Sequence, residues 1–173
     1  MRIVIDMQAM QSESRFRGIG RYARSVVDAL IAVNEKHDII LVVSAAFPES
    51  VLDIRLHYAD RLGTCNILQW HGLYPSAENV KENYSRNEIS RLIFEAFLES
   101  LNPDVVLCCS IFEGYIDDAI TTVPEKRRRK YSTAAIVYDL IPLRMKDTYL
   151  TDESYSAHYY RKLGELKNLD LCL

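Results

Sequence analysis

The sequence predicts an α/β fold in which a doubly wound parallel sheet carries helices on both faces. Two kinds of segment predict this fold: continuous apolar runs and amphipathic helical segments. Apolar runs without alternation, as at residues 39–44 and 105–109, are typical of parallel strands that are buried on both faces. Segments with apolar residues three and four apart separate these runs and indicate amphipathic helices. The alternation of the two along the chain favours parallel strands joined by helical crossovers.

The first half of the chain predicts three strands. The stripe of apolar residues from Ile19 to Ile31 indicates a helix with one face on a core. Residues 71–86 are rich in Gly, Pro, Ser and Asn without a hydrophobic period, so we expect a long loop there. The elements expected before that loop are a strand at residues 2–6, a helix from Ile19, a strand at 39–44, a helix at 48–60 and a strand at 66–70.

The second half continues the alternation. Asn102 and Pro103 end a helical period, and Thr151 is the expected cap of the last helix. The final four residues look like a strand that is cut off, so we expect the chain to be a fragment of a longer protein. The elements expected here are a helix at 87–101, strands at 105–109 and 133–138, a short helix at 115–122 and a helix at 152–167.

Composition excludes several classes of protein. The 173 residues suit one globular domain, and a formal charge of -3 argues against a general nucleic-acid or membrane-surface binder. No apolar run approaches the ~20 residues of a spanning helix. We therefore expect a cytoplasmic protein, either free or peripheral at the inner face of the membrane. The four cysteines lack metal-ligand spacing and are expected to be reduced core thiols.

The segment that precedes the first helix has the features of an anion site. Gly18 and Gly20 lie where that helix begins, and Arg17 and Arg21 flank them. The free amides of a helix N-terminus carry partial positive charge, and glycines let a phosphate approach the backbone closely. The arginines supply further positive charge. The sequence therefore favours a phosphorylated ligand.

Three loops follow strands at the edge where ligands of such sheets bind, at residues 7–18, 110–114 and 139–149. Four motifs in and around them, at residues 16–22, 102–106, 110–114 and 138–143, together resemble the amino-terminal half of bacterial family-four glycosyltransferases of the GT-B fold. The resemblance spans nearly the whole chain. It is nearest to mannosyltransferases that build lipopolysaccharide O-chains and related surface glycans.

The resemblance implies a retaining transfer of a sugar from a nucleotide diphosphate sugar to a glycan or lipid-linked acceptor, between two Rossmann-like domains. Residues 1–173 would be the amino-terminal, acceptor-side domain. By matching motif, Gly18 and Gly20 would approach the donor diphosphate, with Arg17 or Arg21 as its charge partners. The resemblance implies neither a metal nor a cofactor.

One of the matched positions departs from the family pattern, and two others are candidate catalytic residues. Many members carry a histidine where this chain has Tyr138, which can contact the sugar or the acceptor but is a poor base near neutral pH. Asp139 and Glu113 are the candidate catalytic residues, as groups that bind sugar hydroxyls or orient the acceptor. We rank Asp139 first.

The family's paired glutamates, eight positions apart, have no counterpart in this chain. They belong to a carboxyl-terminal, donor-binding domain, which we expect to be absent here. The full-length protein would be the enzyme, and the chain alone would not catalyse transfer. Its expected partners are the donor, the acceptor and that missing domain.

Simpler interpretations stay open at each site. The glycines could serve only a turn, and Glu113 or Asp139 could be cap or turn acids. The basic residues 126–130 could be a solvated turn or a contact for anionic lipid, and the tyrosines of the last helix could be packing or a sugar platform. Residues 18–23 also satisfy G-x-G-x-x-A, so an NAD(P)-dependent oxidoreductase is an alternative, although the glycines lie too far beyond the first strand. A non-catalytic phosphate- or sugar-binding module is another.

Overall fold

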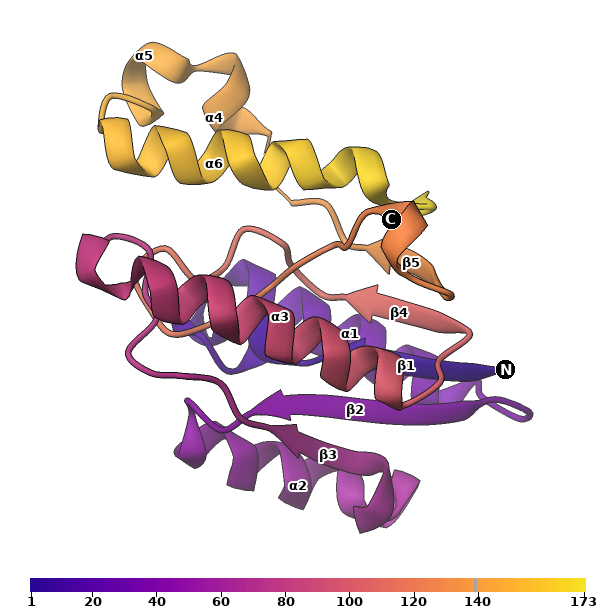
Figure 1. Ribbon diagram of the computed structural model, residues 1–173. Coiled ribbons are helices and arrows are strands. Elements are labelled where there is room, and N and C mark those ends of the chain that lie inside the picture. The colour runs from indigo at the N-terminus through magenta and orange to yellow at the C-terminus, as the bar shows by residue number, and fades with distance from the viewer. Residues whose placement is uncertain (139) are drawn as a thin grey trace.

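The computed structural model describes residues 1–138 and 140–173, which contain one sheet of parallel strands in the order β3-β2-β1-β4-β5-β6 (Figure 1). The predicted doubly wound, Rossmann-like sheet is confirmed. In the centre, β1 pairs with β2 on one side and with β4 on the other. The strands are β1 (Arg2–Asp6), β2 (Asp38–Ser44), β3 (Ile67–Trp70), β4 (Val105–Cys108), β5 (Ser132–Ala135) and β6 (Leu171–Cys172).

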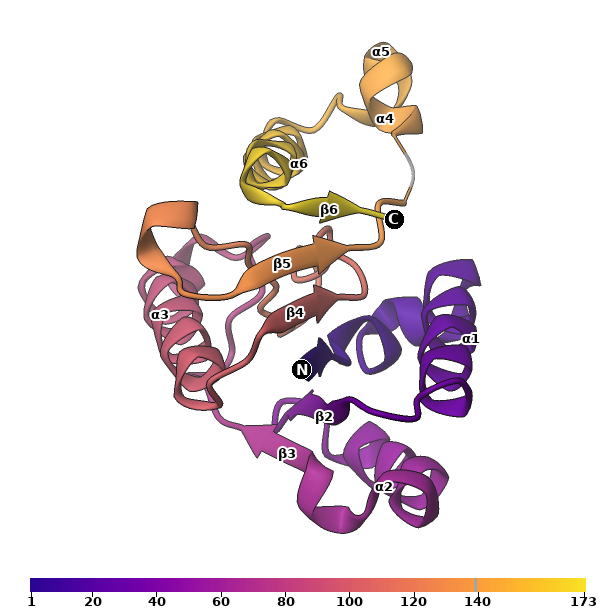
Figure 2. The same cartoon turned by 90° about the vertical axis from the view of Figure 1, so that its right-hand side faces the viewer.

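Helices cover both faces of this sheet. Figure 2 shows α1 (Gly18–Ala32) and α2 (Pro48–Leu62) on one face, and α3 (Tyr84–Ser100) and α6 (Glu153–Glu165) on the other. Two short helices follow β5. These are α4 (Ile141–Arg144) and α5 (Lys146–Tyr149). Short 3-10 turns also occur along the chain: η1 (Gln8–Met10), η2 (Glu13–Phe16), η3 (Thr64–Asn66), η4 (Lys81–Asn83), η5 (Lys126–Arg128) and η6 (Leu166–Asn168).

The two faces have separate cores because successive side chains of a strand point to opposite sides. Ile5 belongs to the core under α1 and α2, whereas Val4 belongs to the core under α3. In that second core Trp70 stacks on Phe94, with ring centroids 4.5 Å apart. A third cluster, around Ala135, lies between β5 and the end of α6. The sheet is thus a rigid base for the loops at its edge.

The direction in which the sheet is wound reverses between β1 and β4. From β1 the chain builds outward through β2 and β3, and it then returns to β4 on the other side of β1. The loops that leave the carboxyl ends of β1 and β4 therefore run over opposite faces of the sheet. In open α/β sheets, ligands bind beside such a reversal.

The predicted helix at residues 115–122 is wrong. This segment is irregular, and it begins after Gly114, which has a φ of +92°. The side-chain amide of Gln8 bonds both the N–H and the C=O of Ile120, and these two bonds replace the ones that Ile120 would make in a helix. The Asp118 side chain accepts a bond from the N–H of Ala77 at 3.1 Å, which ties the segment to the loop after β3.

Two helix starts also differ from the sequence prediction. Asp152, and not Thr151, caps α6 by accepting a bond from the Tyr155 N–H at 2.7 Å. α3 begins at Tyr84, inside the segment expected to be a loop, after the turn η4. No helix in residues 1–138 and 140–173 combines the length and the apolar content that a crossing of the bilayer requires.

The cysteines are reduced, but only two of them lie in the core. Cys108 and Cys109 are buried on opposite faces of the sheet, and burial raises the pKa of both thiols. Cys65 and Cys172 are exposed because they lie in the turn η3 and in the edge strand β6. The prediction of four core thiols is therefore wrong for these two.

Candidate functional site

The segment between β1 and α1 is a buried, tightly bonded structure. Residues 7–12 are almost inaccessible to solvent, because η1 folds them back over the edge of the sheet. Gln11 exchanges bonds with the backbone of Ser44 at the end of β2, at 2.7 and 3.1 Å. The segment therefore holds the start of α1 in a fixed position.

The first turn of α1 carries the predicted anion-binding residues. Its first backbone bond runs from the Arg21 N–H to the Arg17 carbonyl at 3.2 Å, so the amides of Gly18, Ile19 and Gly20 have no acceptor within the helix. The turn holds no acidic residue and its N-cap makes no side-chain bond. Arg17 and Arg21 are exposed, and they form none of the ion pairs found among the described residues.

The two glycines have different surroundings. A Cβ on Gly18 would meet nothing within 4 Å, whereas a Cβ on Gly20 would lie 2.5 Å from the Cα of Arg15. Gly18 is exposed and Gly20 is buried. Gly20 therefore serves close packing of α1 on η2, and Gly18 is the glycine that leaves space at the surface.

Glu113 lies in the loop after β4 and is only 6% exposed. Its carboxylate accepts a bond from the Ser12 hydroxyl at 2.7 Å, so the loops after β1 and β4 are in direct contact. Burial raises the pKa of Glu113, and the hydrogen bond from Ser12 opposes that rise. Glu113 is thus a fixed, desolvated carboxyl group where the loops after β1 and β4 meet.

A cavity of about 170 Å³ brings residues from these loops together. Arg17, Glu113, Tyr115 and Tyr155 are among the residues that line it. The rings of Tyr115 and Tyr155 meet edge to face, with centroids 5.0 Å apart. The cavity thus combines a guanidinium, a buried carboxylate and an aromatic wall, a set of groups that can position a polar ligand. We call it the edge cavity.

Tyr138, the residue before the third predicted loop, also contacts α1. Tyr138 donates a bond to the carbonyl of Ile19 at 3.4 Å, and its ring packs edge to face on Tyr22 at 5.9 Å. Burial raises the pKa of the Tyr138 hydroxyl, so it is a hydrogen-bonding group and not a base. Asp139, the first-ranked catalytic candidate, lies outside the described residues.

Under these loops lie two ionisable groups that sequence reasoning missed. Asp6 ends β1 and is 3% exposed, and its carboxylate accepts bonds from the N–H and the side chain of Gln8. Burial raises its pKa to about 7, although the bonds from Gln8 oppose this. Lys162 of α6 is 1% exposed, and its ammonium donates to the carbonyl and hydroxyl of Thr121 at 2.5 and 2.9 Å.

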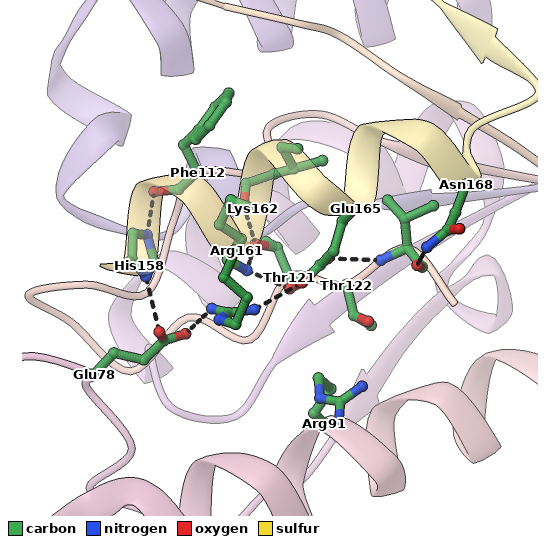
Figure 3. Close-up of polar contacts among 12 residues, drawn as sticks. Glu78, Arg91, Phe112, Thr121, Thr122, His158, Arg161, Lys162, Glu165 and Asn168 are labelled. Carbon is green, nitrogen blue, oxygen red and sulfur yellow. Dashed lines mark hydrogen bonds and ion pairs between the residues drawn. The ribbon is translucent and has the colours of Figure 1, made fainter. Parts of the chain in front are cut away.

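A second polar network joins α6 to the loop after β3, and Figure 3 shows its members. The His158 ring contacts Glu78 through Nδ1 at 2.9 Å and the Phe112 carbonyl through Nε2 at 3.4 Å. Arg161 bonds the other oxygen of Glu78. Burial raises the pKa of Glu78, but these partners outweigh burial and lower it to about 2.

These missed residues carried little signal in the sequence. An acidic residue at the carboxyl end of an apolar strand, followed by Gln8, was the one clue to Asp6. Lys162 and His158 occupy positions on the buried face of α6, where the sequence pattern alone does not distinguish a bonded cation from a solvated one. Their roles depend on contacts with chain segments about 40 or more positions away.

The basic run belongs mostly to the structure and not to this site. Arg129 is 4% exposed at its side chain and pairs with Asp170 at 2.8 Å, and Lys126 pairs with the same carboxylate at 3.0 Å. Arg127 is the most exposed of the run's paired residues, at 81%.

Within residues 1–138 and 140–173 there is no group of three His, Cys, Asp or Glu that could hold a metal ion.

Comparison with known proteins gives one group of relatives. Three serotype-specific mannosyltransferases named WbdA, from Escherichia coli, are similar to the chain. One is 30% identical over 171 residues, which are 98% of this chain and 20% of that protein, and another is 26% identical over 143 residues, which are 82% of this chain and 17% of that protein. The chain is related to part of a mannosyltransferase. It spans about a fifth of the length of these relatives. No family model and no solved structure matches it.

Proposed function

We propose that the chain is the acceptor-side domain of a retaining glycosyltransferase that moves a sugar, mannose foremost, from a nucleotide diphosphate sugar to a glycan or lipid-linked acceptor in surface polysaccharide synthesis. The observation that carries this proposal is the edge cavity, where Arg17 from the loop after β1 and Glu113 from the loop after β4 lie together. The similarity to WbdA over nearly the whole chain supports it.

In this proposal the first turn of α1 binds the donor diphosphate. The free amides at Gly18 and Ile19 offer hydrogen bonds, and the exposed Arg17 and Arg21 offer positive charge. When the bond between the anomeric carbon and the phosphate oxygen breaks, negative charge grows on the leaving diphosphate. A preorganised donor aimed at such charge commonly contributes about 3 kcal/mol.

Glu113 and Tyr138 then contact the sugars. The Glu113 carboxylate is fixed by Ser12 and can accept bonds from sugar hydroxyls at its remaining lone pairs. Tyr138 supplies a hydroxyl near α1. Asp139 keeps its proposed catalytic role from the family motif, and no metal or cofactor enters the reaction. A carboxyl-terminal domain with the paired glutamates completes the enzyme. The enzyme acts in the cytoplasm, either free or peripheral at the inner face of the membrane.

Direct binding measurements on the full-length protein, which includes the donor-binding domain, test the proposal. Isothermal titration calorimetry of that protein with GDP-mannose, UDP-glucose and NAD⁺ should give saturable binding of a sugar nucleotide and none of NAD⁺. Arg17→Ala and Arg21→Ala should each weaken that binding, and Arg127→Ala, a change at an exposed arginine far from α1, should not. Saturable binding of NAD⁺ alone would favour the oxidoreductase and end the proposal.

Gly18→Val is the sharper test of the helix N-terminus. Gly18 has open space around it, so the larger side chain should fit without disturbing the fold while it blocks the approach of a phosphate to the backbone. We expect donor affinity to fall about tenfold or more, equivalent to roughly 1.4 kcal/mol, with an unchanged circular dichroism spectrum. Full donor affinity in a folded variant would remove this turn from the mechanism.

A further inference from the structure

The largest cavity among the described pockets lies away from the edge cavity, between the start of α3 and α6. It has a volume of about 400 Å³, and its lining includes Glu78, Lys81, Tyr84, Glu88 and Arg161. Neither the donor nor the reacting sugars of the proposed reaction use it. We call it the side cavity.

The charges that line the side cavity are balanced and mostly fixed. Glu78 bonds His158 and Arg161, and Glu88 pairs with Arg91 at 3.1 Å. Lys81 lines the side cavity and takes part in none of the ion pairs found within residues 1–138 and 140–173. A site with two acidic and two basic side chains does not attract an anion or a cation strongly. It does offer many hydrogen-bonding groups, which suit a neutral ligand rich in hydroxyls.

An exposed aromatic ring adds to this chemistry. Tyr84, the first residue of α3, is 71% exposed, and Val80 beside it is 42% exposed. An aromatic side chain presents a large apolar face together with a polar hydroxyl. Such a ring, next to carboxylates and a guanidinium, matches a sugar unit, which has apolar C–H faces and a rim of hydroxyl groups.

Hydrogen bonds join the chain segments that line the side cavity to those that line the edge cavity. The N–H groups of Glu78 and Asn79 bond the carbonyls of Gly114 and Tyr115, at 3.1 and 2.9 Å. Gly114 and Tyr115 line one cavity and Glu78 lines the other. On α6, Tyr155 faces the edge cavity and Arg161 faces the side cavity. Between them the His158 ring joins Phe112 to Glu78, as Figure 3 shows.

We propose that the side cavity is a second carbohydrate subsite, which holds a sugar unit of an oligosaccharide acceptor while its reacting end lies in the edge cavity. The acceptor identity rests on the proposed function, and the carbohydrate chemistry rests on the cavity itself. The Tyr84 ring packs on the face of the distant sugar, and Lys81 donates to its hydroxyls. An acceptor of several sugars therefore binds more tightly than a single sugar.

Calorimetry with two probes tests this subsite on the 173-residue chain. We expect linear α-mannotetraose to bind more tightly than mannose. Tyr84→Ala should weaken the binding of mannotetraose about three- to tenfold, the effect of one lost aromatic contact, and should leave that of mannose unchanged. Lys81→Met should act in the same direction. Tyr160→Ala removes a tyrosine that is 45% exposed on α6 and lines neither cavity, so it is the matched control.

Two outcomes would overturn the subsite: equal affinity of mannose and mannotetraose, or an effect of Tyr84→Ala no larger than that of Tyr160→Ala. GDP-mannose separates this result from the fate of the proposed function. Loss of donor binding with intact, Tyr84-dependent binding of mannotetraose would leave a carbohydrate-binding module. Donor binding without any advantage for mannotetraose would leave the transferase and remove the subsite.

Discussion

Two glycines that look alike in the sequence have different physical roles. The backbone of α1 approaches η2 so closely at Gly20 that an added Cβ would also lie 2.6 Å from the Ser14 carbonyl oxygen. At Gly18 the same addition meets open space. The motif therefore combines a packing requirement at one position with surface access at the other.

This difference predicts that the same substitution changes the free energy of unfolding by different amounts at the two glycines. Gly20→Ala should lower the free energy of unfolding by about 1–3 kcal/mol, the usual cost of overpacking. Gly18→Ala should change it by less than about 1 kcal/mol, because the alanine restricts the unfolded chain without a clash. Urea unfolding followed by circular dichroism measures both. Equal stabilities would mean that α1 and η2 can separate without cost.

At the scale of elements, the start of α6 depends on one exposed side chain. Asp152 accepts from the Tyr155 N–H and also from the Tyr115 hydroxyl at 3.0 Å. It therefore caps the helix and ties it to the loop that forms the edge cavity.

Asp152→Ala should lower the melting temperature by about 2–4 °C, the usual consequence of a lost cap in a chain of this size. Thr151→Ala is the control, because Thr151 is the cap that the sequence predicted and the structure gives that role to its neighbour. A larger effect at Thr151 would contradict the assigned cap. Differential scanning calorimetry can compare the two variants.

The sequence predicted the elements whose character depends on their own residues. The apolar runs identified strands such as β2, and the stripe from Ile19 identified α1. Residues 115–122 were misread because hydrophobic period does not reveal which backbone groups a distant side chain bonds. Gln8 lies 112 positions from Ile120. The prediction of where α3 begins was wrong for a related reason, because its polar first turn has no hydrophobic period to detect.

The candidate site was predictable only in part. The arrangement of parallel strands brings the loops after β1 and β4 to one edge, so Arg17 and Glu113 were expected to be close. The structure places both in one cavity. Lys162 and Asp6 were not predicted, because their burial depends on how α6 packs over the irregular segment after β4.

For the whole molecule, Asp6 and Glu78 contribute in opposite ways to the dependence of stability on pH. The folded protein holds the Asp6 proton more tightly than the unfolded chain does, since burial raises the Asp6 pKa from 3.8 to about 7. The contribution of Asp6 is therefore complete below pH 4 and is lost as the pH rises to 7. Glu78, whose pKa falls from 4.5 to about 2, stabilises the fold above pH 4.5 and loses this effect as the pH falls to 2.

Asp6→Asn should flatten the decline between pH 4 and 7, because asparagine keeps an acceptor for Gln8 without a charge. The variant should gain stability relative to the unchanged protein as the pH rises through that range. Urea unfolding at half-unit pH steps measures this, and Asp60→Asn, at an exposed aspartate of α2, is the control. If the free energies of unfolding of Asp6→Asn and of the unchanged protein varied with pH in parallel, the raised pKa of Asp6 would be refuted.

The two hydrogen bonds between the Gln8 side chain and the backbone of Ile120 predict the rate of hydrogen–deuterium exchange at Ile120. The Ile120 amide donates to the Gln8 side chain at 2.8 Å, and both residues are almost fully buried. This amide hydrogen should exchange as slowly as those of the central strands, although it lies in a coil. Hydrogen–deuterium exchange would thus show slow exchange around Ile120, in a segment without regular secondary structure. This result would show that the bonds between Gln8 and Ile120 hold the loops after β1 and β4 together.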